Sequence, residues 1–301
     1  MNPPRRSGRP GRALLILLPL LCCQAGPSFA QLLHLDEIPW QAPVDSTSQL
    51  ALVVEADRFF DPRFDWTVNR LLLTVVLPGG EDGIFFVRMP HLTFDSGAES
   101  AASRWPEILG EETPANWPSS SRVKSFGQLE VGSVSRVALP GLGGVQFGTA
   151  LGLPVGVDKL YPFSSTSLPL RGELRKIVPV GRRWWIQARG GYLLNMDSGK
   201  ADLSSDAFAS GTHLGFDLAW YRGRGSRLLL TADLAERNGR RSRLVGLQWW
   251  GGWTDDGSVG IRIAKELEDG TDRPASWYLG LAWRFDSPAH RPGAAPAKPK
   301  R

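Results

Sequence analysis

The sequence predicts an all-β protein, a transmembrane antiparallel up-and-down β-barrel of about twelve strands. Long stretches alternate between large apolar residues and small or polar ones. The connections between these stretches sort into brief turns and longer loops. After residue 48 there is no convincing helical periodicity and no hydrophobic stretch of the roughly 20 residues that a membrane-spanning helix needs.

The stretch WYLGLAWRF, residues 277–285, has the alternation in its clearest form. Successive side chains of a strand point to opposite faces, so its Trp, Leu and Phe side chains share one face. The other face carries Tyr278, Gly280, Ala282 and Arg284. An apolar face of this kind covers the core of a soluble sandwich or meets lipid in a transmembrane barrel, and this stretch alone leaves both open.

The first thirty residues have the form of a secretory signal peptide. Its apolar run, ALLILLPLL, follows a basic stretch that contains Arg5, Arg6, Arg9 and Arg12. Residues 28–30 have the small-x-small form of a cleavage site, which predicts a mature chain beginning at Gln31. Both cysteines lie in this segment, so the predicted mature chain has none and is stabilised without disulfides.

The net charge does not indicate a nucleic-acid partner. The formal charge of +5 includes four arginines of the signal peptide, and 5 − 4 leaves +1. Further basic residues lie in the Pro-, Ala- and Lys-rich tail at 286–301, which we expect to be disordered. We therefore expect no binding to nucleic acid.

Twelve strands follow from the alternating runs and the Gly-, Asn- and Asp-containing turns between them. Their predicted ranges are 49–59, 66–78, 83–94, 124–139, 143–153, 167–179, 182–194, 211–222, 226–236, 242–253, 257–267 and 276–285. The connections after even-numbered strands are all brief, whereas the long ones, 95–123, 154–166 and 195–210, all follow odd-numbered strands. A soluble sandwich has no reason to sort its loops in this way.

With the signal peptide, the loop asymmetry and a last strand closing on Phe285, the chain resembles the bacterial outer-membrane β-barrel proteins. The resemblance is architectural, covers the whole mature chain and selects no functional family. It implies an outer-membrane location with both termini in the periplasm. It also implies contact with outer-membrane lipid and lipopolysaccharide, and insertion by barrel-assembly machinery that recognises a final aromatic residue, here Phe285.

The chain then divides into four parts. We expect a signal peptide at 1–30, a periplasmic N-terminal segment at 31–48, an outer-membrane barrel at 49–285 and a periplasmic tail at 286–301. The longest predicted loop contains five carboxylates, which suit calcium or lipopolysaccharide cations or belong to a solvated lid: Asp95, Glu99, Glu107, Glu111 and Glu112.

Charged residues recur at the inward phase of the predicted strands. Unpaired charges in a soluble core cost several kcal/mol each, whereas in a barrel they face water or one another. These residues either fill the lumen with ion pairs or line a pore and select solutes, and their mixed signs argue against strong selectivity. The candidate lumen-lining residues are Arg171, Glu173, Arg175, Arg189, His213, Asp217, Asp233, Arg262, Glu266 and Arg284.

His213 is the first residue to consider for catalysis, because outer-membrane barrels include lipid-modifying enzymes. Ser210 is three positions away, on the opposite face of an extended strand. Asp217 shares the face of His213 but lies about 13 Å along the strand, too far to orient the imidazole. We therefore expect a luminal histidine, no catalytic residues, no metal and no cofactor.

Passage of small solutes through a pore is the leading functional interpretation. Two alternatives belong to other classes: a lipid-acting outer-membrane enzyme, and a non-conducting structural or adhesion barrel. The sequence identifies no particular solute.

Overall fold

The computed structural model describes residues 50–61, 66–79, 83–95, 122–140, 143–153, 168–196, 210–223, 226–237, 240–254, 257–267 and 277–287. The predicted signal peptide, the N-terminal segment 31–48, the loop carboxylates from Glu99 to Glu112 and the tail after Ser287 lie outside these residues. Among the described residues, no helix has the length and hydrophobicity needed to cross a membrane.

The described residues form thirteen β-strands in one sheet. They are β1 (Ala51–Asp61), β2 (Trp66–Pro78), β3 (Gly83–Asp95), β4 (Arg122–Phe126), β5 (Leu129–Leu139), β6 (Gly143–Leu153), β7 (Leu168–Pro179), β8 (Trp184–Met196), β9 (Gly211–Gly223), β10 (Ser226–Arg237), β11 (Arg240–Thr254), β12 (Gly257–Glu266) and β13 (Trp277–Asp286).

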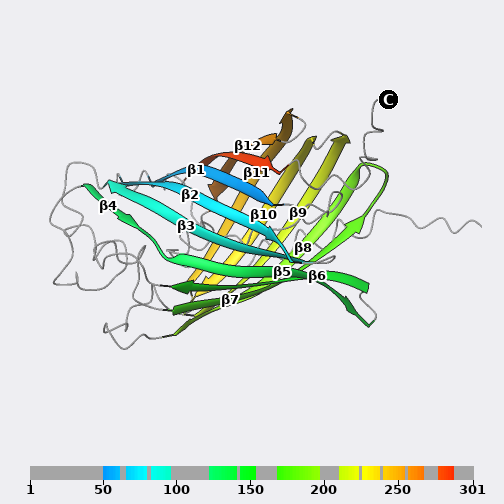
Figure 1. Cartoon of the computed structure of the whole chain (residues 1–301), viewed down its shortest axis with the longest axis horizontal. Helices are drawn as coiled ribbons and strands as arrows, with labels where there is room; N and C mark the ends of the chain where they lie inside the picture. Colours follow the sequence, from blue (N-terminus) through cyan, green and yellow to red (C-terminus); the bar gives the residue numbers. More distant parts are fainter. Residues whose placement is uncertain are drawn as a thin grey trace, which may run out of the picture.

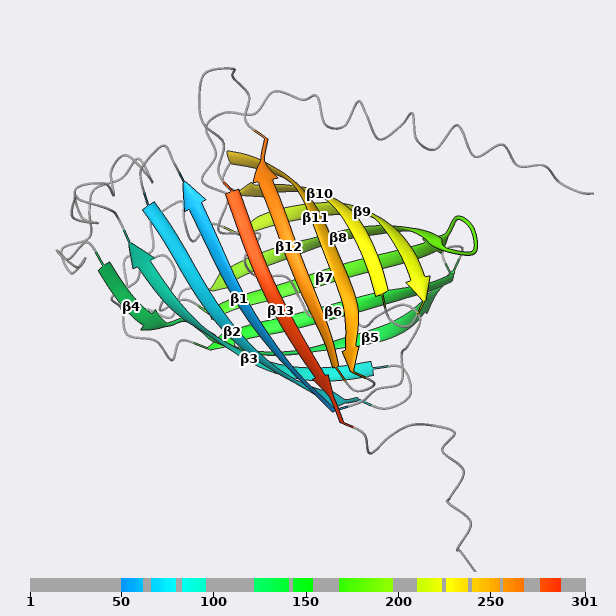
Figure 2. The ribbon, with the colours of Figure 1, turned by 90° about the horizontal axis from the view of Figure 1, so that it is seen from above.

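The sheet closes on itself because the first and last strands pair (Figures 1 and 2). β1 runs antiparallel to β13 from Ala51 opposite Asp286 to Phe60 opposite Trp277. The remaining strands follow one another around the wall, each antiparallel to its neighbours. Closure gives both edges of the sheet a hydrogen-bonding partner, as a membrane interior requires.

One predicted strand, 124–139, is interrupted in the structure. β4 and β5 both pair with β3, and the break falls between them at residues 127–128. Opposite the break lies Pro90, which has no N–H to donate, and the Gly127 amide donates to the Pro90 carbonyl at 2.8 Å. β4 and β5 therefore occupy a single place in the wall, and the barrel is twelve-stranded.

The other predicted strand bounds agree with the observed ones to within two residues, and those of β2 and β6 coincide. As predicted, the long connections all lie at the same end of the barrel. One end of the barrel, the short-turn end, holds connections 79–82, 140–142, 180–183, 224–225 and 255–256. The opposite, long-loop end holds connections 62–65, 96–121, 154–167, 197–210, 238–239 and 267–276. The Ser287 amide donates to the Leu50 carbonyl at 2.8 Å, so the barrel begins and finishes at the short-turn end.

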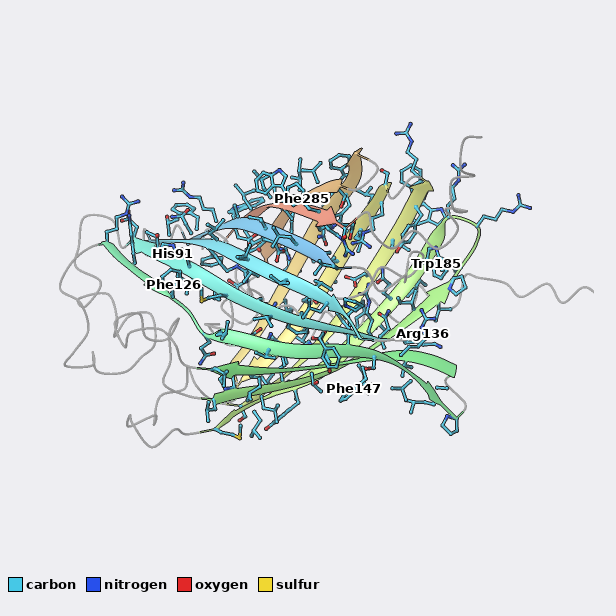
Figure 3. All side chains as sticks on the ribbon, viewed as in Figure 1. His91, Phe126, Arg136, Phe147, Trp185 and Phe285 are labelled. Atoms are coloured by element: carbon cyan, nitrogen blue, oxygen red, sulfur yellow. The ribbon has the colours of Figure 1, made fainter. Side chains whose placement is uncertain are left out.

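The alternation predicted from the sequence separates the two faces of the wall. Leu279, Leu281 and Ile261 are 49%, 44% and 50% exposed, whereas Tyr278 and Ala282 are buried. Leu214 and Leu218 are exposed as well. Side chains project all around the wall in Figure 3, where Phe147 points away from the strands. The outer face is therefore apolar, the character of a lipid-facing surface.

The inner face is apolar on one flank. Phe86 is fully buried, and a Cβ atom added at Gly132 on the facing strand would lie 2.4 Å from its ring. The absence of a side chain at Gly132 thus makes room for the phenyl group. The buried cluster around Phe86 spans β1, β2, β3, β5 and β6 and comprises Ala51, Val76, Ile84, Phe86, Val134 and Ala150.

Adjacent residues near the middle of β10 provide a matched test of the two faces. Leu230 is 55% exposed on the outside, whereas Thr231 is half-buried inside and in register with Asp217. In a bilayer, Leu230→Arg should lower the free energy of unfolding by about 2 to 4 kcal/mol. Thr231→Arg should cost much less because the guanidinium meets a carboxylate. Denaturant titration of the protein folded into vesicles measures both, and equal losses would contradict the assignment of the faces.

Candidate functional site: the inner wall

All ten residues predicted to line the lumen occupy inward-facing positions of their strands. Three of them, His213, Arg262 and Arg284, are half-buried. The other seven are between 1% and 8% exposed: Arg171, Glu173, Arg175, Arg189, Asp217, Asp233 and Glu266. These charged groups therefore pack against other parts of the chain and do not stand free in a wide aqueous space.

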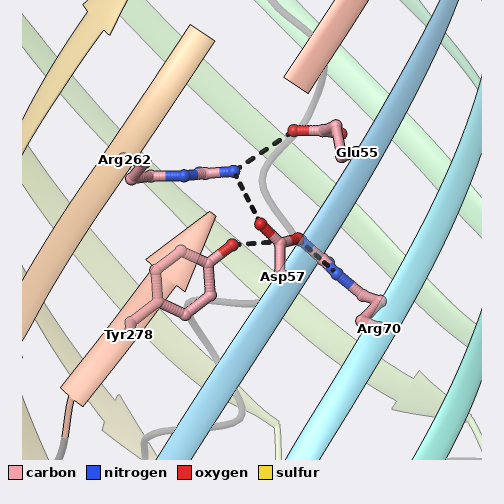
Figure 4. A network of polar contacts seen from close by, with 5 residues as sticks. All are labelled: Glu55, Asp57, Arg70, Arg262 and Tyr278. Atoms are coloured by element: carbon pink, nitrogen blue, oxygen red, sulfur yellow. Dashed lines mark hydrogen bonds and ion pairs between the residues drawn. The ribbon is translucent and has the colours of Figure 1, made fainter. Parts of the chain in front are cut away.

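One group of inward charges lies where the first and last strands meet (Figure 4). Asp57 accepts two hydrogen bonds from Arg70, through Nε at 2.9 Å and Nη2 at 2.5 Å. Arg262 Nη2 lies 3.2 Å from Glu55 and 3.7 Å from Asp57. Arg70 Nη2 also donates to the Tyr278 hydroxyl at 3.4 Å. We call this group, which joins β1, β2, β12 and β13, the seam network.

Tyr278 also packs against a cation of the seam network. The Arg262 guanidinium carbon lies 5.0 Å from the centroid of its ring, within the range of a cation–π contact. Arg262 thus contacts both the Tyr278 ring and two carboxylates. The network as a whole balances two arginines against two carboxylates.

Gly280 makes the space that the seam network needs. It lies opposite Asp57 on β13, and a Cβ atom added there would lie 2.4 Å from Asp57 Oδ1. Asp57 Oδ1 is the oxygen that approaches Arg262. Any side chain at position 280 would push this carboxylate away from the arginine.

A second ion-pair group spans β8 to β10. Arg189 Nη2 lies 2.6 Å from Asp233 and 3.8 Å from Asp217. Gly215 stands between Arg189 and Asp233 in register, and an added Cβ atom would lie 2.4 Å from each of these side chains. The same device therefore recurs, with a glycine on the middle strand letting charges on its two neighbours meet.

His213 contacts a carboxylate that sequence reasoning did not assign to it. Its Nε2 lies 3.2 Å from Glu173 Oε1, across Gly191 on the intervening strand. Both residues were predicted to line the lumen, but the register that brings them together is not visible in the sequence. Among the described residues, no group of three or more His, Cys, Asp or Glu side chains forms a metal site.

Several inward charges of the first strands and of β10 escaped the prediction. Arg88 forms an ion pair with Glu130, which also lies 3.7 Å from Arg171. The alternation that located the other residues applies to these strands as well. It places each of the missed residues at an inward-facing position, so the alternation would have found them. The residues missed are Glu55, Asp57, Arg70, Arg88, Glu130 and Arg227.

The inner wall nearer the short-turn end contains buried polar atoms that have no hydrogen-bond partner among the described residues. Both amide atoms of Gln187, which is fully buried, have no hydrogen-bond partner among the described residues. The same holds for Gln146 Oε1 and Trp250 Nε1. Arg227 lies 5.5 Å above the Trp250 ring. Buried polar groups are normally paired, so water or polar solute groups are the natural partners here.

The fold has counterparts among solved structures. The COG4313 outer membrane channel from Pseudomonas putida F1 has a TM-score of 0.62 at 11% sequence identity, over 82% of this chain and 100% of that chain. The chain has the fold of a bacterial outer-membrane β-barrel. The KdgM porin in complex with disordered oligogalacturonate has a TM-score of 0.48 at 9% identity, over 78% of this chain and 98% of that chain. No protein-family model and no curated protein matches the sequence.

Replacing Gly280 tests how the seam network is held. Gly280→Ala should displace Asp57 from Arg262 and lower the free energy of unfolding by about 1 to 3 kcal/mol, the usual penalty for a buried polar group that loses its partner. Gly172→Ala on β7 is the matched control, because nothing lies within 4 Å of a Cβ atom added at Gly172. Denaturant titration of both variants measures the difference. A Gly280→Ala protein as stable as the control would show that the network does not depend on this space.

Proposed function

We propose that this protein is a channel in the outer membrane of a Gram-negative bacterium, through which small polar solutes pass. The observation that supports it is the contrast between the two faces of a closed wall. The outside exposes Leu, Ile, Phe and Trp side chains, whereas the inside holds arginines and carboxylates from nearly every strand. Such an interior suits water and hydrophilic solutes, and such an exterior suits lipid.

The passage is expected to be narrow and weakly selective. The charged inner side chains are mostly less than a tenth exposed, so they occupy space that a wide pore leaves open. Charges of both signs are mixed on the inner wall, as in the pairs of Arg189 with Asp233 and of Arg88 with Glu130. A mixed ring attracts neither cations nor anions strongly, and we expect a small unit conductance.

We further propose how the barrel is placed in the membrane. The signal peptide directs export, and the short-turn end faces the periplasm together with both termini, since short turns lie on that side in outer-membrane barrels. Phe285 is 44% exposed on the outer face and lies one residue before the end of β13. It is the residue that we propose the barrel-assembly machinery recognises. Outer-membrane lipid and lipopolysaccharide surround the wall.

Conductance of the purified barrel in planar bilayers tests the channel directly. Arg136 lies on the inner face near the short-turn end, in register with Gln146, and its side chain is exposed. Arg136→Glu replaces a positive charge at the mouth by a negative one, so the ratio of cation to anion permeability should rise by about twofold. Arg222→Glu is the matched control, because Arg222 is exposed on the outer face near the same end.

The reversal potential in a salt gradient measures the permeability ratio. The channel hypothesis expects a shift for Arg136→Glu and none for Arg222→Glu. A folded parent protein that gives no conductance for any salt or small solute would overturn it in favour of a non-conducting structural barrel.

A further inference from the structure

The outer face near the long-loop end differs between the two halves of the barrel. On five consecutive strands, β6 to β10, a leucine occupies the outward position two or three residues from the long-loop end. Leu151, Leu170, Leu194 and Leu214 are 37% to 47% exposed, and Leu234 is half-buried. This half presents a continuous leucine row, as expected of a wall in contact with acyl chains.

On β1 to β4 the corresponding row is polar. Arg58 is in register with Asn69, Asn69 with Thr93, and Thr93 with Lys124. Each lies two or three residues from the long-loop end of its strand, the same level as the leucines. Arg58 and Lys124 are exposed. Neither forms an ion pair with a carboxylate among the described residues. We call these four residues the polar row.

A third exposed cation lies on β12, across β13 from β1, one outward position nearer the long-loop end than Arg58. Lys265 on β12 has its Nζ 5.5 Å from the ring centroid of Trp277 on β13, and Trp277 is in register with Phe60 of β1. Tryptophan favours the boundary between acyl chains and headgroups. Lys265 therefore lies at the level at which headgroups begin, and the polar row lies one outward position further from the long-loop end.

Cations on a lipid-facing wall are tolerated near an interface and costly in the middle of the bilayer. At the interface they find phosphate, with which guanidinium and ammonium groups form strong charge-assisted hydrogen bonds. Arg58 and Lys124 are three strand spacings apart, about 14 Å, far enough to hold two phosphate groups at once. Asn69 and Thr93 lie between them and offer hydrogen bonds to phosphate or sugar oxygens.

We propose that the polar row, with Lys265, is a binding site for the phosphorylated headgroup of an anionic lipid of the outer leaflet, of the lipid A type. The inference rests on the proposed function in one respect, the orientation that places the long-loop end outside. The leucine row opposite has no such chemistry, so the lipid is held on one side of the barrel only.

The test uses the full-length mature barrel refolded in detergent and titrated with diphosphoryl lipid A, dephosphorylated lipid A and inorganic phosphate. The parent should bind diphosphoryl lipid A at least about tenfold more tightly than the dephosphorylated form, and inorganic phosphate weakly. The double variant Arg58→Gln and Lys124→Gln should lose about thirtyfold in affinity, since each cation near an anionic lipid contributes about 1 kcal/mol. Arg58→Lys should keep most of the affinity.

The matched control removes two exposed cations at the opposite end of the barrel, as Arg182→Gln and Arg222→Gln, and should bind diphosphoryl lipid A like the parent. Heat-modifiable gel mobility confirms that every variant is folded. Equal affinity for the two forms of lipid A, or unchanged affinity in the Arg58 and Lys124 variant, would overturn the inference. Dimerisation of the parent through the polar row would also overturn it. Such a dimer would be recognised if the parent is dimeric without lipid and the Arg58 and Lys124 variant is monomeric.

The outcome is separable from that of the channel hypothesis. Selective lipid binding by a barrel that does not conduct would contradict the channel alone. Conductance without a preference for the phosphorylated lipid would contradict this inference alone.

Discussion

The pairing of β1 with β13 is the constraint on which the rest of the structure depends. A sheet that faces lipid must satisfy every backbone amide and carbonyl within itself, and only closure removes the two free edges. Side chains on the inner face also connect these strands, because Asp57 lies against both Arg70 and Arg262, and Arg70 donates to the Tyr278 hydroxyl. Backbone pairing and the side chains of the seam network therefore both connect β1, β2, β12 and β13.

Closure also divides every strand into an inner and an outer set of residues. Because side chains alternate, the register at the seam fixes which set is inside for the whole wall. The inner residues are charged and closely packed, so the charged side chains need room to reach their partners. Glycines on intervening strands solve this problem at Gly280, Gly215 and Gly191, where missing side chains let polar side chains of the two neighbouring strands meet. The outer set is largely apolar, and near the long-loop end of β1 to β4 it carries the polar row.

The strands and the two faces were predictable because both follow from local alternation. In WYLGLAWRF the alternation puts Leu279 and Tyr278 on opposite faces, and the barrel predicted from the whole chain places Leu279 outside and Tyr278 inside, as the structure has them. The contacts were not predictable, because they depend on register between strands. His213 meets Glu173, forty residues earlier in the chain, only because Gly191 aligns with both.

Other features were hidden for different reasons. The break between β4 and β5 is caused by Pro90 on the partner strand, which the sequence of residues 124–139 does not reveal. The apolar flank around Phe86 was hidden because β3 is apolar on both faces there, with Phe85 exposed outside and Phe86 buried inside.

The most direct measurement of closure is disulfide trapping across the seam. The predicted mature chain has no cysteine, so two introduced cysteines report on their own separation. Ala56 and Leu281 face each other on the outside of the seam, and directly opposite residues are close enough for a disulfide. Ala56→Cys with Leu281→Cys should form the bond readily under mild oxidation, whereas Ala56→Cys with Leu279→Cys, two residues out of register, should form little. Equal yields from the two pairs, or none from the first, would contradict a barrel closed in this register.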